Sequence, residues 1–194
     1  MAGTGVNEDP FLALMPVVKA CNELDIAYYV GGSLASSLHG VPRATNGVDV
    51  IAALRPRHVE PFVSRLADAY YIDGRMILDG LMRNIPANLI HLATMVKIDL
   101  YGEPSMPFTR EALLRARKED LPGCPMPIRF ATPEDVLLAK LKWYLDGGQR
   151  SERQWGDLLG ILRVQGGALD QEYIDRWLDA LHVREIHVRL QHEV

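Results

Sequence analysis

The spacing of apolar residues differs between the first and the second part of this chain. Up to about residue 120, short apolar runs of strand length alternate with segments whose apolar residues recur every three or four positions, as on an amphipathic helix. After residue 131 the helical spacing dominates. We expect strands at 26–30, 48–54, 70–72, 88–92, 96–101 and 128–130, and helices at 10–24, 33–39, 57–67, 75–83 and 109–118.

The clearest helix start lies in the second half of the chain. Thr132 is followed by Pro133 and then by two acids. A hydroxyl at the cap, proline at the first helical position and an acid at the third are typical of a helix start. Ser151, Asp170 and the segment after Leu181 open further helices. Just before them, 121–127 carries three prolines and is expected to be irregular.

This order of elements predicts an α+β fold. A mixed sheet flanked by helices would be built from residues 1–125, and a C-terminal helical bundle from 126–194 would pack on it. A length of 194 residues suits one compact domain with a small helical appendage. No internal repeat or low-complexity run interrupts the sequence.

Composition narrows the class of protein. A net charge of −4 provides no general attraction for nucleic acid or an anionic membrane. It does not exclude a local basic patch. The polar start, 1–10, lacks the apolar core of a signal peptide, and no apolar run approaches the roughly 20 residues that cross a bilayer. Cys21 and Cys124 fit no metal-ligand spacing. We expect a cytoplasmic protein without disulfides or a membrane partner.

Gly31-Gly32-Ser33 lies between a predicted strand and a predicted helix. Glycines let a backbone approach a ligand closely, and the N–H groups at a helix start favour an anion. Ser33 adds a hydroxyl donor and is also the expected helix cap. The alternative is an ordinary turn between a strand and a helix.

Two acids lie inside apolar strands. Asp49 stands between Val48 and Val50, and Asp99 between Ile98 and Leu100. A carboxylate within an apolar strand is costly unless it is paired or binds a metal. Taken alone, each acid could equally be an ordinary solvent-exposed residue. If their strands are neighbours, however, the two could meet on one face and provide the hard oxygen ligands that Mg²⁺ requires.

Taken in order, these features resemble the polymerase-β-like nucleotidyltransferase superfamily. Gly31-Gly32-Ser33 is followed by an acidic strand about a dozen residues on, and by a further acid on a later strand. The pattern is most similar to the bacterial AbiEii-type and related minimal nucleotidyltransferases, which are linked to toxin–antitoxin systems. Supporting segments are Gly40 with Arg43-Ala44-Thr45, 132–140 and 150–157. The resemblance covers roughly residues 10–165 and implies a nucleotidyltransferase-like mixed sheet.

The resemblance also implies roles for individual residues. Asp49 and Asp99 would be catalytic and would hold Mg²⁺, while Lys140 and Asp157 would be catalytic residues from the helical half. The nucleotide would be bound by Gly31, Gly32, Ser33, Arg43, Thr45 and Arg153. One position departs from the pattern: the first acid of the family's Asp-x-Asp pair would occupy position 47, which here is Gly47, with Asn46 a neutral and misdirected substitute.

Several of these residues have plainer readings. The Lys140 stem could cover the core beneath a solvated head, and Arg153 could pair with Asp157 on a helix surface, since the two are four residues apart. Arg43 could be a solvated loop residue. A basic cluster, made of Arg110, Arg115, Arg117 and Lys118, indicates a solvated helix face or a surface for RNA or an acidic partner.

We therefore expect a nucleotidyltransferase-fold protein that transfers a nucleoside monophosphate from a nucleoside triphosphate to a hydroxyl of RNA, protein or a small molecule, with Mg²⁺. It could be a toxin with a cognate antitoxin protein. Two alternatives stay open. Gly47 could mark a catalytically impaired relative that acts by binding a nucleotide or a partner, or the chain could be a small-molecule adenylyltransferase of the antibiotic-modifying kind.

Overall fold

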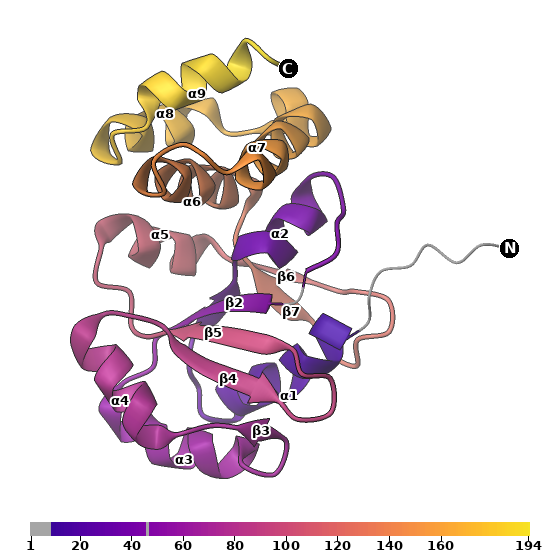
Figure 1. Cartoon of the computed structure of the whole chain (residues 1–194), viewed down its shortest axis with the longest axis vertical. Coiled ribbons are helices and arrows are strands. Elements are labelled where there is room, and N and C mark those ends of the chain that lie inside the picture. The colour runs from indigo at the N-terminus through magenta and orange to yellow at the C-terminus, as the bar shows by residue number, and fades with distance from the viewer. Residues whose placement is uncertain (1–8, 46) are drawn as a thin grey trace, which may run out of the picture.

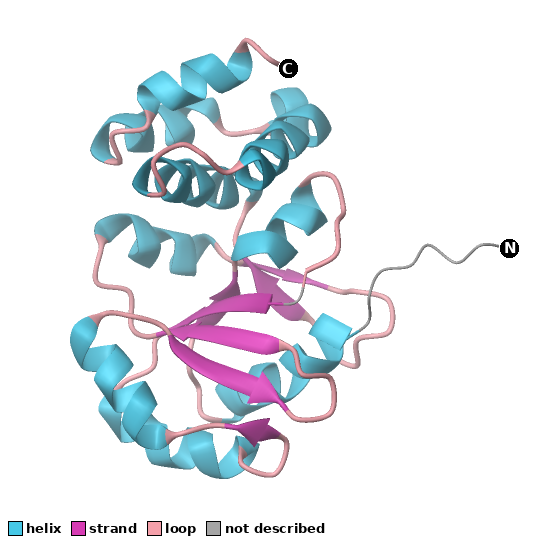
Figure 2. Ribbon diagram, in the orientation of Figure 1, coloured by secondary structure: helices cyan, strands magenta, loops and turns pink. Residues whose placement is uncertain are grey.

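A mixed β-sheet of seven strands, counted over the described residues, forms the centre of the fold (Figures 1 and 2). This computed structural model describes residues 9–45 and 47–194, so the N-terminal residues 1–8 and Asn46 lie outside it. The strands are β1 (Tyr28–Val30), β2 (Gly47–Ala52), β3 (Tyr70–Tyr71), β4 (Ala87–His91), β5 (Lys97–Tyr101), β6 (Arg117–Glu119) and β7 (Ile128–Phe130). Their order across the sheet is β3-β4-β5-β2-β1-β7-β6.

Helices lie on both sides of this sheet (Figure 1). They are α1 (Asp9–Glu23), α2 (Gly32–His39), α3 (Pro56–Leu66), α4 (Gly74–Arg83), α5 (Pro107–Arg115), α6 (Pro133–Asp146), α7 (Glu152–Gln165), α8 (Gln171–Ala180) and α9 (Arg184–Gln191), with a short 3₁₀ turn, η1 (Gly166–Ala168), after α7. In Figure 1, α6 to α9 gather above α2 and α5, and α3 and α4 lie on the opposite side of the sheet. The predicted α+β class, with a helical C-terminal half, is confirmed.

The predicted caps at Thr132, Ser151 and Asp170 are confirmed. Each side chain accepts a hydrogen bond from the backbone N–H three residues later. The strands expected at 88–92 and 96–101 are present as β4 and β5, which pair antiparallel as a hairpin. The helical half begins at Pro133, after β7, which belongs to the sheet. The division at residues 125 and 126 stays a prediction.

Two local predictions are wrong. The helix expected at 109–118 ends at Arg115, because Ala116 is extended and Arg117 and Lys118 enter β6, where they pair with β7. Ser33 is not the cap of α2: Gly31 holds that position, without a side-chain cap, and Ser33 lies within the first turn of the helix. The Ser33 hydroxyl is thereby free to bond elsewhere.

The two faces of the central strands differ in polarity. On β2 and β5, Val48, Val50, Ile98 and Leu100 are buried on one face, together with the core. Because successive side chains point to opposite sides of a strand, Asp49 and Asp99 lie on the other face. That face carries the polar residues of both strands.

The helix α2 joins the sheet to the helical half through close backbone contact. A Cβ atom at Gly40 would lie 2.8 Å from the Ile161 nitrogen of α7, so only glycine lets the two backbones approach. Hydrogen bonds reinforce this contact: His39 Nε2 bonds the Ala131 carbonyl at 2.7 Å, and Gln165 Nε2 donates to the His39 carbonyl at 2.7 Å. The C-terminal end of α2 is therefore fixed relative to α7 and to the segment that leads into α6.

Two further observations complete the fold. Cys21 is a buried free thiol and Cys124 a half-buried one. Over the described ranges, 9–45 and 47–194, no helix combines the length and the apolar character that crossing a membrane requires.

Candidate active site

Asp49 and Asp99 are directly paired across two neighbouring strands. β2 and β5 run parallel, and their register sets Asp49 opposite Asp99 and Gly47 opposite Lys97. Residues paired in register share a face of the sheet, so the two carboxylates lie side by side. Asp99 keeps 19% of its side chain exposed and Asp49 is half-buried. The condition set by the sequence, that the two acids meet on adjacent strands, is met.

The Asp49 carboxylate lies against the start of α2. A Cβ atom at Gly32 would lie 1.7 Å from Asp49 Oδ2, and Gly32 has φ +57°, so both space and backbone conformation require glycine there. The Gly31 N–H donates to the Asp49 backbone carbonyl at 2.9 Å. The Gly31-Gly32-Ser33 turn is thus built directly onto the acidic strand.

The electrostatic surroundings of Asp49 favour a cation. Burial raises the pKa of Asp49 above its ordinary value, and the negative charge of Asp99 raises it further. The positive charges of Lys140 and Lys97 and a hydrogen bond from the Ser33 backbone N–H act in the opposite direction on this pKa. Two adjacent carboxylates with incomplete compensation are a site that a bound cation stabilises.

Lys140 reaches the site from α6 as part of a buried ion-pair cluster. Its Nζ donates to Asp157 Oδ2 of α7 at 2.7 Å. Arg43, in the loop after α2, donates through Nε to Asp157 Oδ1 at 2.6 Å and through Nη2 to the Ser33 hydroxyl at 2.6 Å. Asp157 thus holds both cations, and Arg43 is tied to the first turn of α2.

Burial and ion pairing have opposite effects on the pKa values of Asp157 and Lys140. Burial raises the pKa of Asp157, but the hydrogen bonds from Arg43 and Lys140 outweigh it and hold this pKa below its ordinary value. Burial also lowers the pKa of Lys140, which the Asp157 carboxylate opposes. The cluster therefore presents positive charge next to a deprotonated Asp157.

Other predicted site residues lie less centrally. The Thr45 hydroxyl donates to the Gly47 carbonyl at 2.9 Å, which ties the loop to the start of β2. Arg153 is exposed, and the surface pair with Asp157 that its spacing suggested is not formed, because Asp157 is taken by Arg43 and Lys140.

The predicted basic cluster is divided between two elements. Arg115 pairs with Glu134 and Asp135, both buried at the start of α6, so it links α5 to α6. Arg117 and Lys118 are exposed on β6. The cluster is therefore not a single helix face.

Sequence reasoning missed three residues on the acidic face. Lys97 precedes Asp99 by two positions and bonds it, with Nζ 2.9 Å from Asp99 Oδ2. Asn88 of β4 is exposed and pairs in register with Asp99. Tyr101 follows Asp99 by two positions on β5 and so lies on the same face, and burial and the charges of Asp49 and Asp99 raise its pKa to about 12. The alternation of β5 signals Lys97 and Tyr101, whereas Asn88 depends on the strand register.

The candidate site offers two carboxylates, those of Asp49 and Asp99, as ligands for a metal ion. Across the described ranges, no three His, Cys, Asp or Glu side chains gather as metal ligands. Asp49 and Asp99 nevertheless suit one Mg²⁺, which commonly takes one or two carboxylates and completes its shell with water and substrate phosphates. Gly47 offers no side chain for a second ion, so the donor set fits one metal and not two.

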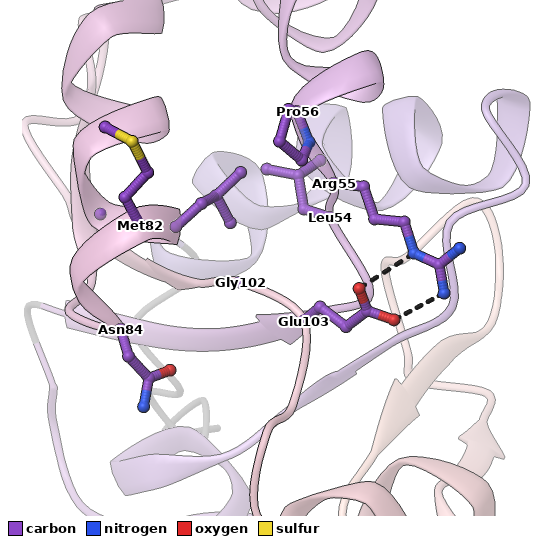
Figure 3. A pocket seen from close by; sticks show the side chains of 9 residues that line it. Leu54, Arg55, Pro56, Met82, Asn84, Gly102 and Glu103 are labelled. Carbon is purple, nitrogen blue, oxygen red and sulfur yellow. Dashed lines mark hydrogen bonds and ion pairs between the residues drawn. The ribbon is translucent and has the colours of Figure 1, made fainter.

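A small cavity lies beyond the last residues of β2 and β5 (Figure 3). Its volume is about 170 Å³, and Leu54, Pro56 and Met82 are among the residues that line it. At its side the Arg55 guanidinium donates two hydrogen bonds to the Glu103 carboxylate. Ligand pockets usually measure roughly 300–1,000 Å³. This cavity is too small for a nucleotide.

Comparison with known proteins yields structural neighbours only. No model of a protein family and no curated protein matches the chain. The antibiotic-resistance factor ANT(2'')-Ia matches with a TM-score of 0.58 over 95% of this chain and 98% of its own, at 13% identity.

Two further solved structures match in the same way. An antigenic nucleotidyltransferase-like protein from Paracoccidioides brasiliensis gives a TM-score of 0.54, at 17% identity, over 81% of this chain and 75% of its own. The lincosamide antibiotic adenylyltransferase LnuA gives 0.50, at 11% identity, over 82% and 98%. The chain therefore has the fold of these nucleotidyltransferases.

Proposed function

We propose that this chain is a nucleotidyltransferase, which transfers a nucleoside monophosphate from a nucleoside triphosphate to a hydroxyl group, with Mg²⁺ as cofactor. The observation that carries the proposal is the register of Asp49 with Asp99 beside the Gly31-Gly32-Ser33 turn. Paired carboxylates next to a helix start are an arrangement for a metal-bound triphosphate.

The residues around the acids have parts to play in that reaction. The acceptor oxygen would form a bond to the α-phosphorus and lose its proton to water, while the bond from that phosphorus to the α–β bridging oxygen breaks and pyrophosphate leaves with the bond's electrons. When bound, Mg²⁺ would neutralise phosphate charge during this transfer. Lys140 and Arg43 would add positive charge at the phosphates, and the first turn of α2 would offer backbone N–H groups.

We further propose that the acceptor is a small molecule. The match to ANT(2'')-Ia spans nearly the whole of both chains, and a structure of that protein is described in complex with adenylyl-2"-tobramycin. LnuA is described as a lincosamide antibiotic adenylyltransferase. RNA or protein acceptors, a toxin role and an antitoxin partner stay predictions from the sequence.

The test is release of pyrophosphate from each of the four nucleoside triphosphates, with Mg²⁺ and a panel of hydroxylated antibiotics, and mass spectrometry of the acceptor. We expect an acceptor-dependent release and an acceptor heavier by one nucleoside monophosphate. The control is the double variant Asp49→Asn, Asp99→Asn, which keeps the shape of both side chains and removes their charge. Equal release by this double variant would refute the assignment of the site.

Gly47 favours a second candidate function: binding of a nucleotide without transfer. A site with room for one metal has lost part of the charge that stabilises phosphoryl transfer. Tight, Mg²⁺-dependent binding of a triphosphate without pyrophosphate release on any acceptor would support this function in place of the first.

A further inference from the structure

The empty position of the acidic pair has a lysine directly opposite it. Gly47 of β2 and Lys97 of β5 are partners in the parallel register, one step before the partners Asp49 and Asp99. All four residues share one face, because they are two positions apart on their strands. A Cβ atom at Gly47 would find its nearest neighbour, the Lys97 carbonyl oxygen, at 3.7 Å. Gly47 thus leaves open space beside Lys97.

The Lys97 ammonium is directed toward the acids. Its Nζ lies 2.9 Å from Asp99 Oδ2, and its charge also lowers the pKa of Asp49 on the neighbouring strand. About half of the Lys97 side chain, 51%, is exposed. The ammonium therefore contacts Asp99, and the exposed half of the Lys97 side chain leaves it accessible to an incoming phosphate.

Charge balance links Gly47 to Lys97. A carboxylate at position 47 holding a second divalent ion would add one net positive charge to this face. A glycine facing an ammonium adds the same net charge without the ion. Gly47 and Lys97 together therefore supply the net charge that a carboxylate with a second metal ion would bring, although they offer no open coordination position.

We propose that Lys97 is a phosphate-binding residue that takes the place of a second metal ion, so that this site binds a nucleoside triphosphate with one Mg²⁺ and retains part of its affinity without any. This inference rests on the proposed function, since it concerns the same triphosphate site. It adds a residue and a metal requirement that distinguish this chain from a two-metal enzyme.

The experiment measures equilibrium binding of α,β-methylene-ATP, which cannot release pyrophosphate, by calorimetry at constant ionic strength. Wild type, Lys97→Met and Lys118→Met are each titrated in excess EDTA and in Mg²⁺. Lys118 is an exposed lysine on the edge strand β6, so its replacement removes the same charge away from the site. Thermal unfolding verifies that the variants are folded.

We expect the wild type to bind in EDTA, and Lys97→Met to weaken this binding about tenfold to a hundredfold, the usual effect of losing one charge-assisted hydrogen bond. Lys118→Met should match the wild type. With Lys97 gone, Asp99 loses its ion-pair partner, so Mg²⁺ titrated without nucleotide should bind the Lys97→Met protein more tightly.

Three results would decide against the inference. Binding by the wild type in Mg²⁺ but not in EDTA would overturn the role of Lys97 and leave the proposed function intact. So would equal binding in EDTA by wild type and Lys97→Met. A wild type that binds the analogue under neither condition, with all four nucleoside bases tried, would overturn the proposed function itself.

Discussion

Asp157 accepts a hydrogen bond from Lys140 at 2.7 Å, and both side chains are almost wholly buried, with 5% and 3% exposed. The other Asp157 oxygen accepts from Arg43. With both oxygens engaged by cations, Asp157 has the surroundings of a residue that positions Lys140 and Arg43. The sequence suggested a catalytic role for it, and the geometry supports action through these two partners.

Replacing Asp157 by asparagine should destabilise the protein strongly. The change leaves the Lys140 ammonium buried with one charged partner fewer, and removing one member of a buried ion pair usually costs about 3–5 kcal/mol. Arg43 is more exposed and can turn to water, so the lower part of that range is expected. The free energy of unfolding in urea, measured at neutral pH, provides the value.

A double variant separates the ion pair from other effects of the change. In the Asp157→Asn background, Lys140→Met removes the ammonium that has lost its partner, and should restore part of the lost stability. If the double variant is less stable than Asp157→Asn by the full effect of Lys140→Met alone, the two residues act independently and the cluster has been misinterpreted.

Gly40→Ala should loosen the contact between α2 and α7. The new methyl group would lie 2.8 Å from the Ile161 nitrogen and 2.9 Å from the Gly160 carbonyl carbon, both backbone atoms of a helix. We expect a loss of about 1–3 kcal/mol, the usual effect of overpacking, measured by thermal unfolding.

The matched control lies in α7, the helix that Gly40 contacts. A Cβ atom at Gly156 would meet nothing within 4 Å, so Gly156→Ala should stabilise α7 by up to about 1 kcal/mol through helix propensity alone. Destabilisation by Gly156→Ala as large as that by Gly40→Ala would show that neither effect arises from the contact with α2.

The sequence predicted those parts of the fold that depend on local patterns. Thr132, Ser151 and Asp170 cap their helices as their neighbours indicated, because capping needs only residues three positions apart. The failure at 109–118 has a non-local cause: Arg117 and Lys118 favour a helix in isolation, but pairing with β7 draws them into the sheet. Helical spacing does not indicate strand partners such as Phe130 and Arg129, which lie 13 and 11 residues after Arg117 and Lys118.

The candidate site divides in the same way. Asp49 and Asp99 could be singled out because an acid inside an apolar strand is conspicuous in any sequence. Their pairing, by contrast, depends on β2 and β5 being neighbours with one particular register, which periodicity does not specify. The same register brings Lys97 opposite Gly47, a relationship that the sequence pattern does not indicate either.

The buried His187 should make the protein less stable as the pH falls. It is 3% exposed, its Nε2 has no hydrogen-bond partner in the described structure, and burial lowers its pKa, with Asp175 acting in the opposite direction and Arg184 adding to the decrease. In the unfolded chain a histidine takes up a proton below a pH of about 6.5, while the folded protein keeps His187 neutral. The unfolded state then binds more protons, so the free energy of unfolding decreases on acidification.

The measurement compares urea unfolding of wild type and His187→Leu at pH values of about 7 and 5.5. Burial also lowers the pKa of His39, His58 and His91, so the wild-type protein should lose stability through four histidines and His187→Leu through three. Between pH 7 and 5.5, the free energy of unfolding should therefore decrease less for His187→Leu than for the wild type. His192→Gln, at an exposed position, is the control and should run parallel to the wild type. Parallel behaviour of His187→Leu would contradict the prediction.

Asp49→Asn should abolish Mg²⁺-dependent binding of a triphosphate. The amide keeps the size of the side chain but offers no charge, and Asp99 alone, already paired with Lys97, is a poor site for the ion. Calorimetric titration with Mg²⁺ and a non-hydrolysable triphosphate tests this. Stability should be unchanged or slightly higher, since burial and the charge of Asp99 disfavour the Asp49 carboxylate in the folded protein. Undiminished Mg²⁺-dependent binding would place the metal elsewhere.

Gly47→Asp should strengthen the Mg²⁺ dependence of nucleotide binding. The Cβ atom fits, because its nearest neighbour would be the Lys97 carbonyl oxygen at 3.7 Å, and the register directs the new carboxylate to the face of Asp49 and Asp99. A third carboxylate raises the affinity for a divalent ion, by about tenfold if it contributes about 1.4 kcal/mol.

Gly47→Asn separates charge from bulk, since its side chain has the same shape without the carboxylate. We expect Gly47→Asp to bind the triphosphate more tightly in Mg²⁺ and more weakly in EDTA, because without the ion the new carboxylate would pair with Lys97 and repel phosphate. Gly47→Asn should change neither affinity much. If Gly47→Asp and Gly47→Asn behave alike in both titrations, the side chain at position 47 does not reach the metal, and the charge balance between Gly47 and Lys97 loses its basis.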